Sequence, residues 1–555
     1  MAQGGRIGAW TRARRLLAPE RGDLAVVVVY AAASGALALA LPVAAQALVN
    51  TVAFGQLVQP ILVLVLLLAA GLTGFSVLWL LQLWCIETIL QRVFVRAIAD
   101  LGRRFSLLPD DRVATAGVAA ALPRVFELPT IQKALAALLV EGVGVVLQTA
   151  VGLALLSLYH PLLLAFALAL LLGLAVVVGL GRGAVDGALA ESRAKYQAVA
   201  WLERVVRAPA AFRSRRGRVE AASRTDALAR TWLQRRRAHF RTLMRQHVGG
   251  VVLAVLGNTA LLGVGGLLVT RAQLTLGQLV AAEIVVNALA IAFTKLGKQF
   301  EALYDLVAAS QKLGMLIDLP RERHGGEGLP GAGPMAVRAR GLHFAHSGRR
   351  EVLAGAGFEL RAGEHAAITG VGGSGKSTLL ELLAGLRAPE RGAVELDGID
   401  ARVLSLAELR EQVVLVRADE PCHGSLLEHV RALAPEATVA DVAEVLKVCG
   451  LAPVVRDLPQ GLETPLGSDA APLSRSEVAR LALARAMLAR PRLLLLDAVI
   501  EALGLSGPGE HALLEVLFAS DAAWTAVVTT TSLGVARRAR RQLELRGGVA
   551  VEVHT

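Results

Sequence analysis

The chain has 555 residues, which is too long for one ordinary domain, so we expect about two or three folding units. Hydrophobic residues make up 54% of it and the mean hydropathy is +0.54, above the level of soluble domains. The net charge of +12 could indicate nucleic-acid binding, but only 4% of residues are aromatic. The basic residues flank apolar segments, so we expect a membrane surface and no nucleic acid as partner.

The cysteines are far apart in sequence, at Cys85, Cys422 and Cys449. They form no CxxC pair and no metal-ligand spacing, which argues against a disulfide framework or a zinc site.

Six apolar segments are long enough to cross a bilayer, which takes about 20 residues of helix. They cover residues 24–49, 58–85, 135–156, 162–180, 248–269 and 279–293, of which the last is the shortest. A basic stretch precedes the first segment, as in a signal peptide. That segment is much longer than the apolar part of a signal peptide, so we interpret it as a retained membrane helix.

The charge of the connections predicts the orientation in the membrane. The short connections after the first, third and fifth segments contain one Lys or Arg between them, Arg271. The connections after the second and fourth segments are rich in arginine, at 92–112 and 204–245. By the positive-inside rule, these loops and both termini are cytoplasmic. Their content of Ala, Leu, Arg and Glu predicts that the spans continue as helices beyond the membrane.

Polar residues within the sixth segment leave two interpretations open. Glu283 and Asn287 lie one helical turn apart, and charged residues in membranes usually face protein or a water-filled cavity. The pair could line a transport path, or it could form an interhelical hydrogen bond or lie near the membrane interface.

A linker rich in Gly, Pro and charged residues divides the chain. We expect a membrane domain at 1–318, the linker at 319–335 and a second domain at 336–555. Beyond the linker, short apolar strands alternate with helical stretches. The predicted fold is therefore a polytopic α-helical membrane domain of six transmembrane helices followed by an α/β P-loop NTPase domain.

Residues 370–377 read GVGGSGKS, between a predicted strand at 366–369 and a leucine-rich helix. This strand–loop–helix context is the one that a phosphate-binding loop requires. Lys376 would reach the β- and γ-phosphates, and Ser377 and Asp497 would hold Mg²⁺, so we expect ATP and Mg²⁺ as cofactors. The predicted contacts of the nucleotide in this loop are Gly370, Val371, Gly372, Gly373, Ser374, Gly375, Lys376, Ser377 and Thr378.

The phosphate loop and the segment ARLALARAMLARPRLLLLD at 479–497 resemble those of ABC exporter-type half-transporters. The resemblance covers essentially the whole chain, and Pro42 in the first span is typical of such exporters. It implies coupling helices near 111–128 and 201–213, and ATP sites shared between two cassettes. A second half-transporter is therefore the implied partner, with a heterodimer favoured and a homodimer open.

The signature motif of the family, LSGGQ, reads LSRSE at 473–477. Ser474 is retained and could still face a γ-phosphate across the dimer. Arg475 and Ser476 replace glycines that allow the backbone to approach phosphate closely. The aromatic residue that stacks on adenine corresponds to His346, which we expect to stack less well.

The hydrolysis residues implied by the resemblance are replaced. Ala498 occupies the position of the catalytic Glu, Ala418, beside Arg417, that of the Gln, and Thr531 that of the switch His. Gly504 replaces an Asp, and we expect Glu501 to point elsewhere. A general base contributes roughly 10²–10⁴-fold to such a rate. The sequence therefore favours ATP binding over turnover and leaves open whether the chain is an ATPase.

We expect a subunit of an exporter in a bacterial inner membrane, with a cytoplasmic cassette and lipid around its spans. The alternative is a membrane-anchored ATP-binding scaffold or regulator that does not transport. Lipid, peptide, drug and polypeptide exporters share this architecture, so the cargo stays open.

Overall fold

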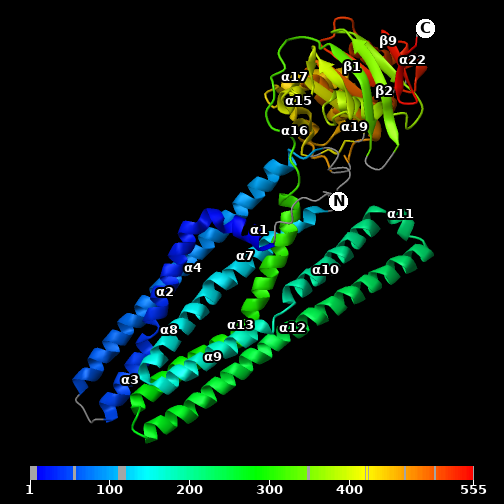
Figure 1. Cartoon of the computed structure of the whole chain (residues 1–555). Coiled ribbons are helices and arrows are strands. Elements are labelled where there is room, and N and C mark those ends of the chain that lie inside the picture. Colours follow the sequence, from blue (N-terminus) through cyan, green and yellow to red (C-terminus); the bar gives the residue numbers. More distant parts are fainter. Residues whose placement is uncertain are drawn as a thin grey trace. The chain divides into compact units, whose positions relative to one another are not determined.

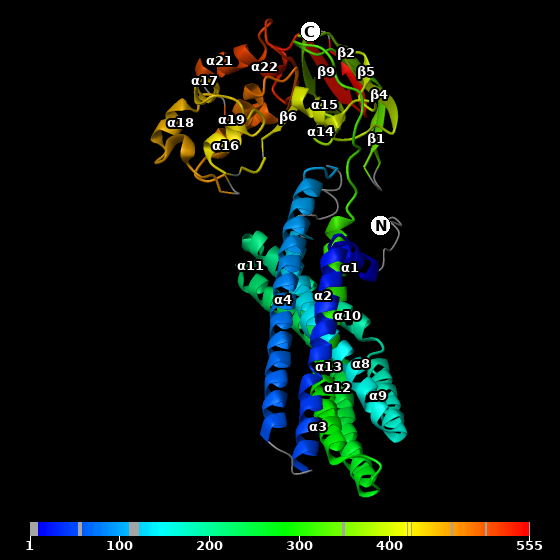
Figure 2. The ribbon, with the colours of Figure 1, turned by 90° about the vertical axis from the view of Figure 1, so that its left-hand side faces the viewer.

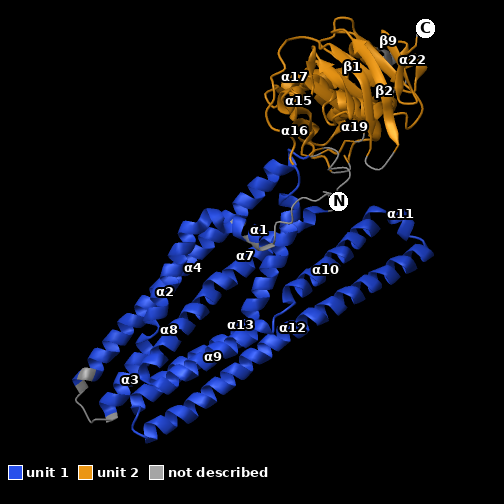
Figure 3. Ribbon diagram, viewed as in Figure 1, with its two compact units in different colours: residues 1–108, 116–320 blue, residues 109–115, 321–555 orange. Residues whose placement is uncertain are grey.

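The computed structural model describes residues 9–53, 58–109, 121–346, 350–418, 420–422, 424–467, 470–504 and 508–553. The chain forms two compact units (Figure 3). Unit 1 comprises residues 1–108 and 116–320, and unit 2 comprises residues 109–115 and 321–555.

The described part of unit 1 is helical throughout (Figure 1). Its α-helices are α1 (Ala9–Leu17), α2 (Arg21–Leu37), α3 (Ala40–Ala53), α4 (Val58–Phe105), α7 (Glu127–Ala137), α8 (Val143–Tyr159), α9 (Pro161–Gly179), α10 (Ala184–Arg207), α11 (Pro209–Phe212), α12 (Arg215–Thr270) and α13 (Leu276–Ile317). Short 3₁₀ turns cover Ala18–Glu20 and Leu122–Phe126, and a π-helical turn covers Leu138–Gly142.

Six helices in the described part of the chain are long and apolar enough to cross a membrane. They are Ala18–Val52, Ile61–Phe105, Leu122–Tyr159, Pro161–Arg207, Arg215–Thr270 and Leu276–Ile317. Each contains or overlaps one of the six predicted apolar segments, and several extend well beyond it, as their helix-forming composition predicts. The predicted six-helix membrane domain is confirmed.

Local sequence explains where several of these helices begin or break. The first span is interrupted between α2 and α3, where Pro42 has no N–H to donate to the carbonyl of Ala38. Pro161 occupies the first position of α9, and Nδ1 of His160 accepts a hydrogen bond from Leu162 N at 3.2 Å. Thr275 begins α13 through a reciprocal capping box with Gln278.

Small residues bring α12 and α13 close together. A Cβ atom at Gly250 would lie 2.4 Å from the carbonyl oxygen of Phe293, and one at Gly297 would lie 2.3 Å from the ring of His247. Close backbone approach at small residues is the usual basis of helix association in membranes.

On helix α13, Asn287 is exposed and Glu283 Oε2 has no hydrogen-bond partner in the described part of the chain. That oxygen therefore does not form the interhelical hydrogen bond that we considered.

Helices α10 and α12 form a long hairpin with α11 at its end (Figures 1 and 2). Trp201 of α10 packs edge-to-face on Phe212 of α11, with ring centroids 5.5 Å apart. Helix α11 falls within the segment predicted as a coupling helix, 201–213. Most of the other such segment, 111–128, lies outside the described residues.

The strands of unit 2 form two sheets. The strands are β1 (Val337–Ala345), β2 (Glu351–Leu360), β3 (His365–Thr369), β4 (Arg391–Leu396), β5 (Ile399–Asp400), β6 (Val413–Arg417), β7 (Leu493–Asp497), β8 (Thr525–Thr529), β9 (Arg541–Arg546) and β10 (Val549–Glu552). One sheet is antiparallel with the order β2-β1-β4-β5, and the other has the order β10-β9-β3-β8-β7-β6. All pairs of the second sheet are parallel except β10 with β9.

Helices pack on these sheets around two buried apolar clusters. They are α14 (Lys376–Leu383), α15 (Leu406–Gln412), α16 (Leu426–Arg431), α17 (Val439–Val448), α18 (Ala452–Asp457), α19 (Arg475–Leu488), α20 (Val499–Ala502), α21 (Pro508–Leu517) and α22 (Leu533–Ala536), with a 3₁₀ turn at Gly461–Glu463. Within unit 2, α16 to α19 gather on the side away from β1 and β4 (Figure 2).

The order of the second sheet determines where its functional side chains lie. The carboxyl ends of β3, β8, β7 and β6 meet at one edge, where ligands of parallel α/β sheets bind. Arg417, Asp497 and Thr529 end three adjacent strands and pair in register.

Candidate nucleotide site

The phosphate loop follows β3 directly and leads into α14. Gly370 has φ of +146°, and a Cβ atom there would lie 2.8 Å from the carbonyl oxygen of Leu545. Gly375 has φ of +102°, and its Cβ would meet Val352 at 2.8 Å. Only glycine fits these two positions without strain. Residues 371–373 are exposed, so the loop is open to a ligand.

The polar groups of the loop suit a polyphosphate. Nζ of Lys376 donates to the carbonyl oxygens of Gly370 and Val371 at 2.7 and 3.1 Å, which holds the ammonium group over the loop. The hydroxyl of Ser374 is buried and has no hydrogen-bond partner in the described part of the chain. The N-terminus of α14 begins at the same place and favours an anion.

Oxygen atoms converge next to the loop. Ser377 Oγ on α14 donates to Asp497 Oδ1 at 3.0 Å, and Thr529 Oγ1 donates to the same oxygen at 3.0 Å. A carboxylate with neighbouring hydroxyls is the oxygen donor set that Mg²⁺ prefers. The residues present therefore fit a magnesium nucleotide.

The position after Asp497 offers no catalytic group. Ala498 is exposed and has φ of 53°, in the left-handed region, and its N–H donates to Thr529 Oγ1 at 2.8 Å. Its methyl side chain can neither accept a proton nor orient a water molecule.

Glu501 instead binds the loop after β8. Its Oε1 accepts hydrogen bonds from Thr530 Oγ1 at 2.8 Å, from Thr531 N at 2.6 Å and from Thr531 Oγ1 at 3.2 Å. The side chain at the switch position is thus fixed by a carboxylate from α20. Sequence reasoning missed this contact, and the only available signal was an acidic residue one turn into a short helix.

Arg417, at the end of β6, points its guanidinium toward α14. Its NH2 donates to Glu381 Oε1 at 2.7 Å, and Glu381 also pairs with Arg387. The neighbouring Ala418 has an apolar side chain and Arg417 a positively charged one, so neither supplies a neutral oxygen ligand for Mg²⁺.

The altered signature forms a regular helix start. Ser474 N donates to Glu477 Oε2 at 2.6 Å, and Glu477 N donates back to Ser474 Oγ at 3.4 Å, which is a capping box. Arg475 is exposed at the first position of α19. A Cβ atom at Gly504 would lie 3.1 Å from Cβ of Ser476, so these two altered positions are neighbours.

His346 follows β1 and lies beside α14. Its Nε2 is 3.4 Å from Thr378 Oγ1, and its ring packs edge-to-face on Phe344 with centroids 5.1 Å apart. The structure thus brings His346, the loop and Asp497 together. Among the described residues, Ser474 forms hydrogen bonds with Ser476 and Glu477 and none with the loop.

Comparison with known proteins agrees with this geometry. Residues 353–501 match the family model described as ABC transporter. A solved structure, described as a bacterial Atm1-family ABC exporter with ATP bound, superimposes with a TM-score of 0.82 at 22% identity and covers 96% of this chain and 95% of its own. The chain has the fold of an ABC exporter half-transporter. The predicted order of a six-helix membrane domain and an ATP-binding α/β domain is confirmed.

Curated relatives that are similar to this chain are named for different activities. The mycobactin import ATP-binding/permease protein IrtB of Mycolicibacterium thermoresistibile is 32% identical over 322 residues, which are 57% of this chain and 55% of that protein. A multidrug efflux ATP-binding/permease protein of Mycobacterium tuberculosis is 30% identical over 336 residues, which are 60% of this chain and 28% of that protein. The chain therefore spans about half or less of the length of these relatives.

Proposed function

We propose that this chain is the ATP-holding half of a membrane exporter dimer. It would bind Mg-ATP between its own cassette and that of a second half-transporter, and so gate the export of a cargo. The proposal rests mainly on one observation. The phosphate loop is assembled with Lys376, Ser377 and Asp497, and the next residue, Ala498, has no side chain that could act as a base.

Each predicted site residue has a role in this proposal. The N–H groups of residues 370–378 and the ammonium of Lys376 hold phosphate oxygens, while Ser377 and Asp497 hold the magnesium ion. His346 lies against the base, and Ser474 faces the nucleotide of the partner. When bound, Mg-ATP supplies the negative charge that draws two cassettes together.

Turnover at this chain's own loop is impaired because the described groups near Asp497 supply no base. Ala498 is apolar, and Oε1 of Glu501 already accepts three hydrogen bonds. A homodimer would contain two such sites, so we favour a heterodimer with an intact half-transporter. The altered signature, Arg475 and Ser476, would weaken the second site as well.

We further propose the limits 1–318, 319–335 and 336–555 for the membrane domain, linker and cassette. The arginine-rich connections support a cytoplasmic cassette, with lipid around the six helices. A bacterial inner membrane agrees with the mycobacterial origin of several relatives.

The first experiment measures binding and turnover of the purified full chain. We expect a fluorescent ATP analogue to bind in the presence of Mg²⁺, Lys376→Ala to weaken that binding about tenfold or more, and hydrolysis to be near background. Ala498→Glu combined with Thr531→His, Arg475→Gly and Ser476→Gly should recover turnover by roughly 10²-fold or more. Rapid hydrolysis by the unmodified chain alone would contradict the proposal.

The second experiment separates the exporter from its alternative. Vesicles containing the chain and each candidate partner half-transporter are tested for ATP-dependent movement of cargo in both directions, since relatives are named for import and for efflux. ATP binding without transport in any combination would favour the membrane-anchored scaffold or regulator. That alternative is supported by Thr531 and Ser474, whose side chains are already engaged within the chain.

A further inference from the structure

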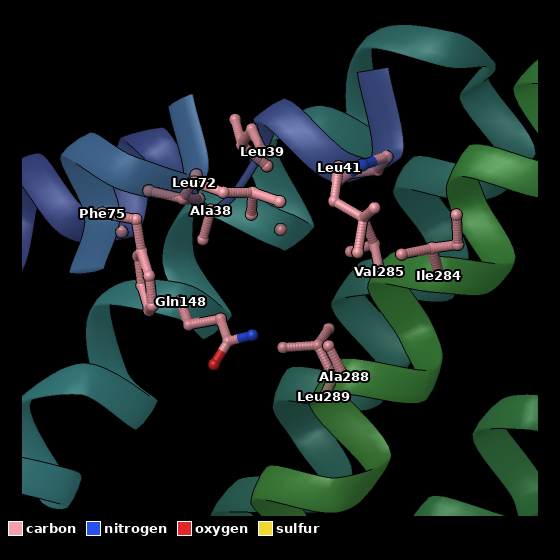
Figure 4. A pocket seen from close by; sticks show the side chains of 14 residues that line it. Ala38, Leu39, Leu41, Leu72, Phe75, Gln148, Ile284, Val285, Ala288 and Leu289 are labelled. Atoms are coloured by element: carbon pink, nitrogen blue, oxygen red, sulfur yellow. The ribbon is translucent and has the colours of Figure 1, made fainter. Parts of the chain in front are cut away.

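A pocket of about 240 Å³ lies within unit 1 at the break between α2 and α3 (Figure 4). Helices α4, α8 and α13 complete its walls, so it is built from four separate parts of the membrane domain. Apolar side chains such as Leu72, Phe75 and Leu289 dominate the lining. Every described lining residue is uncharged, and Gln148 has the one polar side chain among them.

One polar side chain belongs to this apolar space. Figure 4 shows the amide of Gln148 directed from α8 toward the space beside Ala288 and Leu289. That amide forms no hydrogen bond within the described part of the chain.

The walls are held by close helix packing. A Cβ atom at Gly152 of α8 would lie 2.8 Å from Cγ1 of Val285 on α13, so the two helices touch at the pocket. An empty space of this volume would weaken the packing of the bundle, and the half-buried Gln148 amide has no hydrogen-bond partner among the described residues. A ligand that is mostly apolar and forms one or two hydrogen bonds fills the space and supplies that partner.

Size and charge define that ligand. A dry apolar cavity of about 150 Å³ binds benzene, so 240 Å³ holds one ring with a short substituent. An amide both donates and accepts, which suits a hydroxyl or carbonyl group. A charged molecule is disfavoured because these walls offer no counter-ion.

We infer that this pocket is a binding site for an uncharged, mostly apolar molecule of about one substituted ring that hydrogen-bonds to Gln148. The molecule enters from the membrane, in which such compounds dissolve. This inference goes beyond the proposed function, because occupancy of the pocket requires neither ATP nor a partner chain.

The test uses the purified full chain in lipid nanodiscs and two photoreactive probes. One probe is a diazirine-bearing butylphenol, and the other is the same molecule without the hydroxyl group. We expect saturable labelling by the phenol that maps by mass spectrometry to the α8 and α13 residues of the pocket. Ala288→Phe fills the space and should reduce this labelling about tenfold. The matched control Ala150→Phe, exposed on α8, should leave it unchanged.

The role of the amide is tested by Gln148→Leu, which is close in volume. It should reduce saturable labelling by the phenol about five- to tenfold, to the level of the hydroxyl-free probe, and should not change labelling by the latter. An alkylbenzoate should fail to compete. Thermal unfolding checks that each variant folds, and Ala288→Leu replaces Ala288→Phe if the latter does not.

Labelling that does not saturate, or that is equal in the pocket-filling and control variants, would overturn the inference. Equal loss of both probes in Gln148→Leu would overturn the hydrogen bond to the amide. Because no nucleotide is present, these outcomes are independent of the ATP-binding and vesicle experiments.

Discussion

At the residue scale, Glu501 shows how a carboxylate beside a nucleotide site can have a local structural role. Its Oε1 accepts three hydrogen bonds from Thr530 and Thr531, which ties α20 to the loop after β8. A carboxylate so engaged holds the switch position in place and is a poor candidate for activating water.

We therefore predict that Glu501→Ala loosens this loop. Loss of the acceptor leaves the donors of Thr530 and Thr531 without their partner and lowers the free energy of unfolding of the cassette by about 1–3 kcal/mol. Amide hydrogen exchange at Thr531 should accelerate. Glu501→Gln keeps a carbonyl oxygen and serves as the matched control. Exchange at Thr531 that is as slow in Glu501→Ala as in the parent would show that the contact has no structural role.

The thiols of unit 2 give a second prediction at this scale. Burial raises the pKa of Cys449 to about 12 and also raises the pKa of Cys422 above its ordinary value. Thiolate, which is the reactive form, is therefore scarce at both residues at pH 8. We expect a maleimide to label neither residue in the folded protein and both after denaturation, as read by mass spectrometry. Rapid labelling of the folded protein would contradict the buried positions.

At the element scale, the start of α19 shows how the same residues can belong to two sequence motifs. The family's signature is altered to LSRSE, and the same residues contain Ser474 and Glu477 at the spacing of a capping box. The expected signature LSGGQ has Ser and Gln at the same spacing, so the start of the helix does not depend on the two glycines. Reading the segment only as a degraded motif missed this local stabilisation.

The packing of α12 on α13 gives a prediction at the element scale. Gly250→Ala should strongly destabilise the membrane domain, because the new Cβ would lie 2.4 Å from a backbone oxygen of Phe293 that cannot rotate away. The expected loss is about 1–3 kcal/mol. Gly266→Ala on the same helix meets nothing within 4 Å and should be neutral or stabilising. Thermal unfolding of the full chain in detergent measures both, and equal midpoints would contradict the close contact.

At the scale of the whole membrane domain, a buried charge cluster joins three helices that are distant in sequence. Lys312 Nζ on α13 lies 2.9 Å from Glu127 Oε1 on α7, and Tyr196 OH on α10 donates to the same oxygen at 2.7 Å. Lys312 also lies 4.3 Å from the centre of the Tyr196 ring. Because both charged side chains are buried, each is stabilised by the opposite charge of the other.

We predict that Lys312→Met lowers the stability of the membrane domain by about 3 kcal/mol, because Glu127 loses its buried partner and keeps only the exposed Lys195, 3.8 Å away, as a counter-charge. The double variant Glu127→Gln/Lys312→Met should recover most of the loss, because no buried charge remains. Thermal unfolding midpoints of the two variants and the parent decide this. A double variant that is no more stable than Lys312→Met would refute the coupling.

The sequence alone was sufficient for the order of the two domains, the six apolar segments and the strand–loop–helix of the phosphate site. These features depend on continuous stretches: about 20 apolar residues for a span, and one glycine-rich loop between a strand and a helix. Ala498 and Thr531 could be located because each follows a recognisable strand, and their replacement of hydrolysis residues stays a prediction.

Only the tertiary structure showed which side chains meet. Arg417, Asp497 and Thr529 become neighbours through the order of three parallel strands, and Glu127 meets Lys312 across 185 residues of chain. The pocket beside Gln148 likewise needs residues of α2, α3, α4, α8 and α13 at once. Such contacts depend on how distant elements pack, which periodicity and motif spacing do not specify. The sequence therefore determined the parts of this transporter fold, and packing decided which polar groups are paired and which remain available for a ligand.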